Sequence, residues 1–167
     1  SKIFCIQNGT YTFNYLSQNL KNSEINVFDG LTWIDAVRKI NGEVVQFGEE
    51  AKIIVGRNNL SISEQESLKV IAKKVDSKNI QFEFVNDISK AVWEKLIMVA
   101  SIGSIMCYSN MTAKKTVENK FYFKIFKGMI YEMTSASIAL GVNMDKNYAT
   151  NTLNYILGRS EKLHSSL

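Results

Sequence analysis

The sequence has no proline, one histidine, two cysteines and, among its nine glycines, no Gly-x-Gly pair. Two cysteines cannot supply a disulfide framework for 167 residues, and Cys5 and Cys107 lie among apolar residues, which predicts buried free thiols. With one histidine and no Cys-x-x-Cys pair, we expect no metal site. Because no glycine-rich turn opens a helix, the chain has no recognisable place for a cofactor pyrophosphate.

Arginine is scarce as well, with three residues among the 20 basic side chains, and the formal net charge is +4. Planar recognition of phosphate favours arginine, so we expect no nucleic-acid partner. A lysine-rich helix face is expected to be solvated, with nucleic-acid binding as an alternative that rests on charge alone. This face comprises Lys114, Lys115, Lys120, Lys124 and Lys127. The longest apolar stretch, residues 96–108, is short for a bilayer span, which favours a cytoplasmic location without a membrane partner.

The first half of the chain combines strands and short helices. A continuous apolar run at 2–6 is typical of a strand in a parallel sheet, and a short helix is expected over 10–20. Further strands are predicted at 25–28, 31–39, 43–47, 52–55 and 80–85. Asn41-Gly42 lies between two of these strands and is the dipeptide preferred by a type I′ hairpin turn.

Helices dominate the rest of the sequence. Ser63-x-x-Glu66 matches a capping box that begins a helix over 63–77. No strand pattern occurs from Asn86 onwards. Three helices are predicted there, at 88–107 after Asp87, at 119–140 before Gly141, and from near Asp145 to the end. The sequence therefore predicts the strand-rich end of an α/β domain over 1–85 and an all-helical domain over 86–167.

Lys95 interrupts the apolar seam of the helix predicted to begin at Ile88. Apolar residues on this seam include Val92, Val99 and Ile102, and Lys95 lies between them at the same spacing. One interpretation is that the stem of the lysine packs on the core while its ammonium group stays in water. The other is that the lysine points into a cleft at the domain boundary, where it polarises or protonates a substrate carbonyl.

Gln7-Asn8-Gly9 is the second candidate site because it follows the first strand. Ligands of open α/β sheets bind at the carboxyl ends of strands, Asn8 offers both an amide donor and an acceptor, and Gly9 permits close backbone approach. An ordinary strand-to-helix turn is the alternative interpretation. The single histidine, His164, is interpreted as an exposed helix residue.

Several short segments, taken in order, resemble the ketopantoate reductase (2-dehydropantoate 2-reductase) family. They are Gln7-Asn8-Gly9, Gly30-Leu31-Thr32, Ile54-Val55-Gly56, Asn86-Asp87-Ile88, Trp93-Glu94-Lys95-Leu96, Glu132 with Ala139-Leu140-Gly141, and Ser165-Ser166-Leu167. The resemblance covers essentially the whole chain. It implies the C-terminal strands of an NADP-binding Rossmann-type domain over 1–85, without the glycine-rich part. Residues 86–167 then resemble a truncated all-α domain of the 6-phosphogluconate dehydrogenase type.

The reaction that this resemblance implies is the NADPH-dependent reduction of 2-dehydropantoate to (R)-pantoate in pantothenate biosynthesis, with a homodimer as a further expectation. Lys95 matches the lysine that hydrogen-bonds the keto oxygen and donates a proton. Asn8 matches the asparagine at the junction of cofactor and substrate, and Ser166 matches a serine that contacts the substrate. NADPH and a small 2-keto acid are thus the expected ligands of the complete protein.

Two positions depart from the family pattern. Val99 and Gly103 stand where similar proteins place asparagines that hold the substrate's hydroxyl and carboxylate groups, so a related 2-keto acid is an alternative substrate. Asn110 offers an amide beyond this helix. Because the glycine-rich loop is missing, we expect the isolated chain to be inactive. A non-catalytic helical interaction or dimerisation domain is the rival hypothesis, and an exposed apolar patch on 119–140 would favour it.

Overall fold

The computed structural model describes residues 1–21, 24–77 and 80–160. The chain divides into two compact units, Ser1–Val92 and Trp93–Leu167. The described part of the first unit contains a mixed sheet with strand order β1-β2-β3-β4 and two complete helices. The elements are β1 (Lys2–Cys5), α1 (Tyr11–Asn19), β2 (Asn26–Arg38), β3 (Val44–Gly56), α2 (Ile62–Val75) and β4 (Ile80–Val85).

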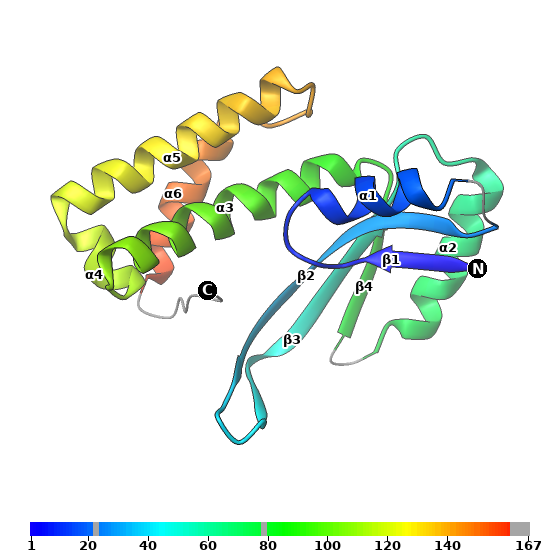
Figure 1. The fold of residues 1–167 in the computed structure, drawn as a ribbon, viewed down its shortest axis with the longest axis horizontal. Coiled ribbons are helices and arrows are strands. Elements are labelled where there is room, and N and C mark those ends of the chain that lie inside the picture. The colour runs from blue at the N-terminus through cyan, green and yellow to red at the C-terminus, as the bar shows by residue number, and fades with distance from the viewer. Residues whose placement is uncertain (22–23, 78–79, 161–167) are drawn as a thin grey trace. The chain divides into compact units, whose positions relative to one another are not determined.

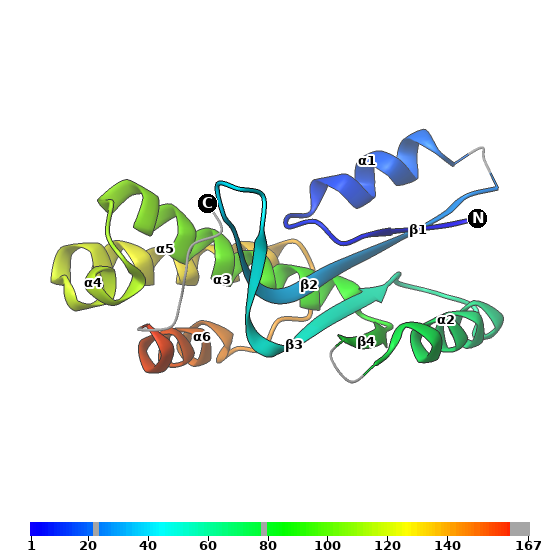
Figure 2. The same ribbon diagram turned by 90° about the horizontal axis from the view of Figure 1, so that it is seen from below.

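The pairing of β1 confirms that the chain opens with a parallel strand. Lys2 to Cys5 pair in parallel with Asn26 to Asp29 of β2, and β4 pairs in parallel with β3. Between them, β2 and β3 form an antiparallel hairpin. Helices α1 and α2 lie on opposite faces of this sheet (Figures 1 and 2). The sheet is therefore mixed, and the prediction of α/β architecture for this part of the chain is correct.

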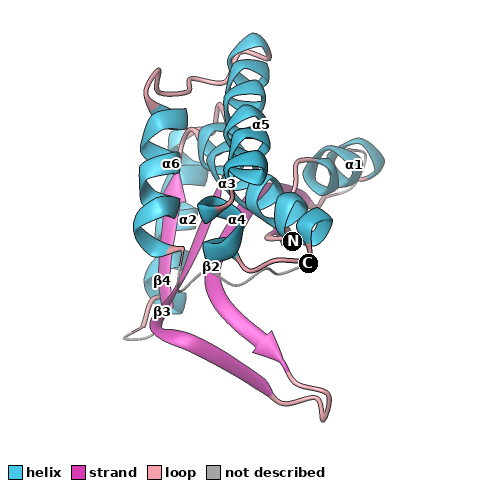
Figure 3. Ribbon diagram, turned by 90° about the vertical axis from the view of Figure 1, so that its left-hand side faces the viewer, coloured by secondary structure: helices cyan, strands magenta, loops and turns pink. Residues whose placement is uncertain are grey.

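The hairpin strands are longer than the sequence suggested. The prediction of two separate strands at 25–28 and 31–39 is wrong, because Gly30 pairs with Val55 and the strand pairing continues through the glycine. Strands at 43–47 and 52–55 likewise merge into β3. The register shifts between Trp33 and Asp35, and the hairpin bends in this region, as a bulge causes (Figure 3).

The hairpin turn lies where Asn41-Gly42 predicted it, but its type differs. Gly42 has φ 85°, whereas Asn41 is absent from the described non-glycine residues with positive φ, so a type I′ turn is excluded. The amide of Gly42 donates to the carbonyl of Lys39 at 2.9 Å, and the Asn41 side chain accepts from the Glu43 amide at 3.1 Å. This pattern is typical of a three-residue loop in which only the glycine takes the left-handed conformation.

The capping box of α2 lies two residues earlier than predicted. Ser61, rather than Ser63, is the N-cap, and its side chain accepts from the amide of Glu64 while the Glu64 carboxylate accepts from the amide of Ser61. Glu64 also forms an ion pair with Arg57. The hydrogen bonds from Ser61 are the main reason that the pKa of Glu64 lies below its usual value. The ion pair with the preceding loop favours Glu64 over Glu66 as the capping residue.

Two glycines allow close packing inside the first unit. A Cβ atom at Gly30 would lie 2.8 Å from the carbonyl oxygen of Ile54, and one at Gly56 would clash with the carbonyl oxygen of Val85. The Cβ of Ile88 would lie 3.1 Å from a Cβ at Gly56, so Gly56 also makes room for the start of α3. Buried Leu31, Ile54, Ile88 and Val92 form a hydrophobic cluster in this region.

The described part of the second unit contains only helices (Figure 3). They are α3 (Ile88–Ser109), which begins in the first unit, α4 (Ala113–Glu118), α5 (Lys120–Ala139) and α6 (Tyr148–Arg159). Asp87 accepts from the amide of Lys90, as expected for the start of α3. Helix α4 was not predicted, because its six residues are too few for a clear periodic pattern. Gly141 has φ 83° and follows the end of α5, as predicted.

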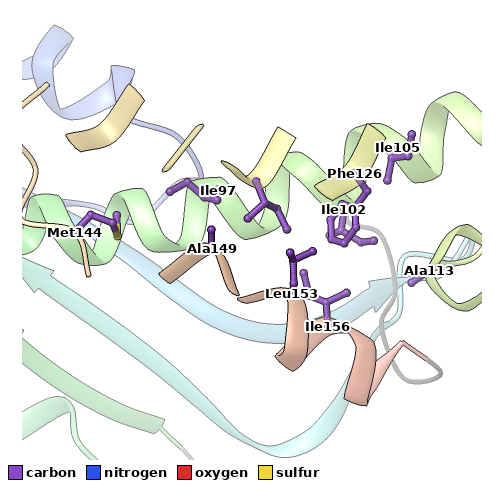
Figure 4. Close-up of a cluster of buried hydrophobic side chains, with 10 residues drawn as sticks. Ile97, Ile102, Ile105, Ala113, Phe126, Met144, Ala149, Leu153 and Ile156 are labelled. Atoms are coloured by element: carbon purple, nitrogen blue, oxygen red, sulfur yellow. The ribbon is translucent and has the colours of Figure 1, made fainter. Parts of the chain in front are cut away.

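A single hydrophobic cluster joins the helices of the second unit. Its buried members are Ile97, Ile102, Ile105, Ala113, Phe126, Ile130, Met144, Ala149, Leu153 and Ile156 (Figure 4). Side chains from α3, α5 and α6 thus meet in one core. Phe121 and Ile125, by contrast, lie on the outer face of α5 and are 63% and 37% exposed. The five lysines of the basic face are all exposed.

The two thiols differ from each other in the structure. Cys5 is buried at 4% exposure, as predicted, and burial raises the pKa of its thiol. Cys107 is exposed, so its prediction as a buried thiol is wrong. Position 107 lies near the end of α3, where the helix turns one side toward solvent.

Helix α3 is long and apolar enough to cross a membrane by length and composition, with a mean hydropathy of 1.3 over its best window. The sequence-based expectation of a shorter apolar segment is therefore corrected. Ile88 and Val92 of this helix belong to the cluster of the first unit, and Ile97, Ile102 and Ile105 belong to that of the second. Packing in these two clusters explains much of its apolar character.

Candidate functional site

Lys95 lies in the second unit on α3, where its side chain is 8% exposed. It is the only lysine among the buried polar residues of the described chain. Little of the side chain reaches solvent, which argues against a lysine that keeps its ammonium group in water. Burial lowers the pKa of Lys95 because the charged form loses hydration. A buried ammonium of this kind is a stronger acid than an ordinary lysine.

Tyr148 supports the backbone beside Lys95. Its hydroxyl, at the start of α6, donates a hydrogen bond to the main-chain carbonyl of Glu94 on α3. Burial raises the pKa of Tyr148, so the hydroxyl remains protonated and able to donate. This contact joins α6 to α3 one residue before Lys95. Tyr148 was not predicted from the sequence, because a tyrosine at the start of a helix has no distinctive sequence signal.

The positions one and two turns beyond Lys95 are apolar, as the sequence showed. Val99 is half-buried, and Gly103 is buried. Asn110, considered as a compensating amide, follows the end of α3 and has φ 51°. Asn110 lies fifteen positions beyond Lys95, which corresponds to roughly 22 Å along a helix. Asn110 therefore cannot contact a small molecule that touches Lys95.

Asn8 lies in the first unit, in the turn between β1 and α1. Its side chain is exposed, and the following Gly9 has φ 100°, a conformation that favours glycine. The turn stands at the carboxyl end of a parallel strand, as expected. Nothing lies within 4 Å of the position that a Cβ at Gly9 would take. The amide of Asn8 is thus available to a ligand that approaches this end of β1.

Asp29 was not identified from the sequence. It is the register partner of Cys5, the last residue of β1, and lies on the strand beside the Asn8 turn. Burial raises the pKa of its carboxyl to about 6, although the amide of Gly30 donates to it at 2.9 Å. An aspartate that directly follows the apolar run Val27-Phe28 was the available signal.

Two sequence-predicted residues, Ser166 and His164, lie outside the described residues. The proposed meeting of Asn8, Lys95 and Ser166 in one site therefore remains a prediction. Among the residues that the structure describes, no group of three or more His, Cys, Asp or Glu side chains could hold a metal ion. The chemistry available within the described second unit is that of a buried, acidified ammonium group on an apolar helix.

The fold, a mixed sheet followed by a set of helices, is shared with solved ketopantoate reductases. Ketopantoate reductase from Ralstonia eutropha matches 99% of this chain with a TM-score of 0.79 at 16% identity, over 52% of its own length. A dimeric ketopantoate reductase from Staphylococcus aureus matches 99% of the chain at 17% identity and TM-score 0.72, over 51% of its length.

A D-mandelate dehydrogenase, solved with NADH, shares the same fold. It matches 97% of this chain with a TM-score of 0.76 at 13% identity, over 50% of its own length. No protein-family model and no curated protein matches the sequence. The chain thus has the fold of these enzymes and spans about half of their length.

Proposed function

We propose that this chain is part of a ketopantoate reductase-family enzyme that reduces a 2-keto acid with a nicotinamide cofactor. The candidate reactions are the NADPH-dependent reduction of 2-dehydropantoate to (R)-pantoate, a step of pantothenate biosynthesis, and the reduction of a related 2-keto acid. The observation that carries the proposal is the buried Lys95 on a fold shared with such reductases. We further propose a cytoplasmic location, which suits a chain whose two cysteines are free thiols.

The proposed role of Lys95 is to polarise the keto oxygen and then protonate it. An ammonium group beside that oxygen stabilises the negative charge that develops as the carbonyl carbon is reduced. Its lowered pKa favours transfer of the proton from Nζ to the resulting alkoxide. The hydroxy acid leaves with that proton, and the neutral amine regains one from water. Tyr148 holds the backbone of the preceding residue and so acts as a positioning residue.

The nicotinamide cofactor supplies the hydride in this proposal. The exposed Asn8 amide suits a polar group of cofactor or substrate, because the turn also contains a glycine that permits close approach. The sequence has no Gly-x-Gly turn, so we assign the binding of the cofactor pyrophosphate to the part of the complete protein outside this chain. Ser166 is proposed to contact the substrate.

A panel of 2-keto acids tests the proposal directly. The full-length gene product is mixed with NADPH or NADH, and cofactor oxidation is followed as each keto acid is added. Saturable oxidation with at least one 2-keto acid is expected. Absence of oxidation across 2-dehydropantoate and short aliphatic and aromatic 2-keto acids, with folded protein and both cofactors, would refute the proposed reaction.

A second candidate function is self-association through α5. The outer face of this helix exposes Phe121, Ile125 and Tyr131 by 63%, 37% and 42%. Burying such side chains between two copies removes apolar surface from water. A homodimer is therefore proposed, either beside the catalytic function or as the chain's sole role. Sedimentation measures the oligomeric state of the wild type and of Phe121→Asp, and so tests the proposed homodimer. Lys124→Asp changes a charge on the same helix and is the control.

A further inference from the structure

The side chains that share a face of α3 with Lys95 are apolar. Ala91, Val92, Met98 and Val99 lie three or four positions before or after Lys95. Ile102 and Gly103 lie seven and eight positions after it. Residues at these spacings share a face of an α-helix with the lysine. None has a hydroxyl, amide, carboxyl or amino group, and the thioether sulfur of Met98 is only a weak acceptor. A molecule bound against Lys95 therefore meets no polar partner from neighbouring side chains of α3.

Val99 is the member of this set that is neither buried nor packed against one of the two hydrophobic clusters. Met98 packs against the core of the second unit, and Ala91 packs against that of the first. Val92, Ile102 and Gly103 are buried. Val99 is half-buried and belongs to neither hydrophobic cluster of the described residues. It lies one helical turn from Lys95, at a Cβ separation of roughly 6 Å.

Resting on the proposed keto-acid reduction, we infer that the substrate is a 2-keto acid with an apolar side chain that lies against Val99. A carbonyl oxygen held by Lys95 places the neighbouring carbons of a small substrate within about one helical turn along α3. A hydroxyl group on those carbons would leave water without gaining a partner from this helix, which is unfavourable. A methyl, branched or aromatic group would instead gain contact with Val99.

A pair of matched substrates tests this inference on the full-length gene product. 2-Dehydropantoate and 3,3-dimethyl-2-oxobutanoate differ only by the hydroxyl group on one methyl carbon. We expect kcat/KM to be greater for the compound without the hydroxyl by roughly tenfold to a hundredfold, the range over which apolar pockets discriminate such isosteres. The ratio is measured in the wild type and does not depend on the folding of a variant.

Variants of Val99 assign the preference to this residue. Val99→Asn provides an amide beside the substrate, and we expect it to shift the kcat/KM ratio toward 2-dehydropantoate by about tenfold or more. Val99→Leu keeps the surface apolar and is the matched control, with the original preference retained. Thermal unfolding of both variants confirms that the comparison is made on folded protein.

The outcomes separate the inference from the proposed function. A wild-type preference for 2-dehydropantoate would overturn the inference while leaving keto-acid reduction intact. A wild-type preference for the other compound that Val99→Asn leaves unchanged would also overturn it, because the discrimination would then arise elsewhere. Turnover of neither compound nor of any other 2-keto acid would refute the proposed function and the inference together.

Discussion

Lys95 is a residue whose burial is unfavourable for folding. Moving an ammonium group out of water costs free energy, and the lowered pKa of Lys95 reflects that cost. The folded chain therefore releases this proton at a lower pH than the unfolded chain, whose lysine titrates near 10.5. Between these two pKa values the unfolded state binds more protons, so the contribution of Lys95 to stability rises with pH.

Replacing Lys95 by methionine separates function from folding. Lys95→Met keeps a long flexible side chain but removes the charge, so we expect an unchanged or higher melting temperature at pH 7. Thermal unfolding followed by circular dichroism measures it, with Lys124→Met on the exposed face of α5 as the control. A fall of the melting temperature by many degrees in Lys95→Met alone would show that the lysine has a structural role.

Asp29 gives the opposite pH dependence. Burial raises the pKa of its carboxyl from 3.8 to about 6, so the folded chain holds this proton more tightly than the unfolded chain. Between those values the folded state binds more protons, and the contribution of Asp29 to stability falls as pH rises. Above pH 6 the folded chain carries a partly buried carboxylate that the unfolded chain would solvate.

We expect Asp29→Asn to stabilise the protein at pH 7 by roughly 1 to 2 kcal/mol, a value reduced to allow for solvent screening. The gain should disappear below pH 4, where both states are protonated. Urea unfolding at several pH values measures this difference in stability between the variant and the wild type. Asp35→Asn on the exposed part of the same strand is the control, because it makes the same substitution at a carboxylate that is not buried. A destabilised Asp29→Asn at pH 7 would contradict the burial argument.

At the scale of single residues, sequence periodicity singled out Lys95 as unusual but left open whether its ammonium group stays in water or points into a cleft. A charged side chain at an apolar spacing is visible in a linear sequence, and the structure buries it. Asp29 and Tyr148 were not identified, because their significance depends on partners that are distant in the sequence. The register of Asp29 with Cys5 and the contact of Tyr148 with Glu94 arise from tertiary structure.

Helix α2 shows, at the scale of elements, how local chemistry selects among similar motifs. Ser61 and Ser63 each precede a glutamate by three residues, and only Ser61 forms the capping box. We expect Ser61→Ala to destabilise the folded protein by about 1 kcal/mol. Ser63→Ala removes a hydroxyl of the same kind two residues later and should cost less than about 0.5 kcal/mol. Equal effects in chemical denaturation would contradict this assignment of the cap.

The hairpin marks the limit of sequence-based prediction of elements. Asn41-Gly42 correctly located the turn, because a chain reversal there needs a residue that accepts positive φ. Glycine at position 30 suggested a break, yet the close approach of the Ile54 carbonyl requires a residue without a Cβ at that point of the ladder. The same residue type thus ends a strand in one context and sustains it in another.

The whole molecule spans about half the length of the solved reductases whose fold it shares. Its sequence has no Gly-x-Gly turn, so the 167-residue chain should not bind NADPH with measurable affinity. Titration with NADPH, followed by cofactor fluorescence, should show no saturable change. The full-length gene product is the control and should saturate. Saturable binding by the isolated chain would show that its own residues form a nucleotide site.

The proposed proton transfer by Lys95 is tested most directly by steady-state NADPH oxidation with the best 2-keto acid substrate. The full-length gene product is compared with Lys95→Ala. We predict that kcat/KM falls by about two orders of magnitude or more in the variant, the size expected when a general acid is lost. A variant that retains the wild-type rate, with unaltered thermal unfolding, would contradict the role of Lys95 in the reaction.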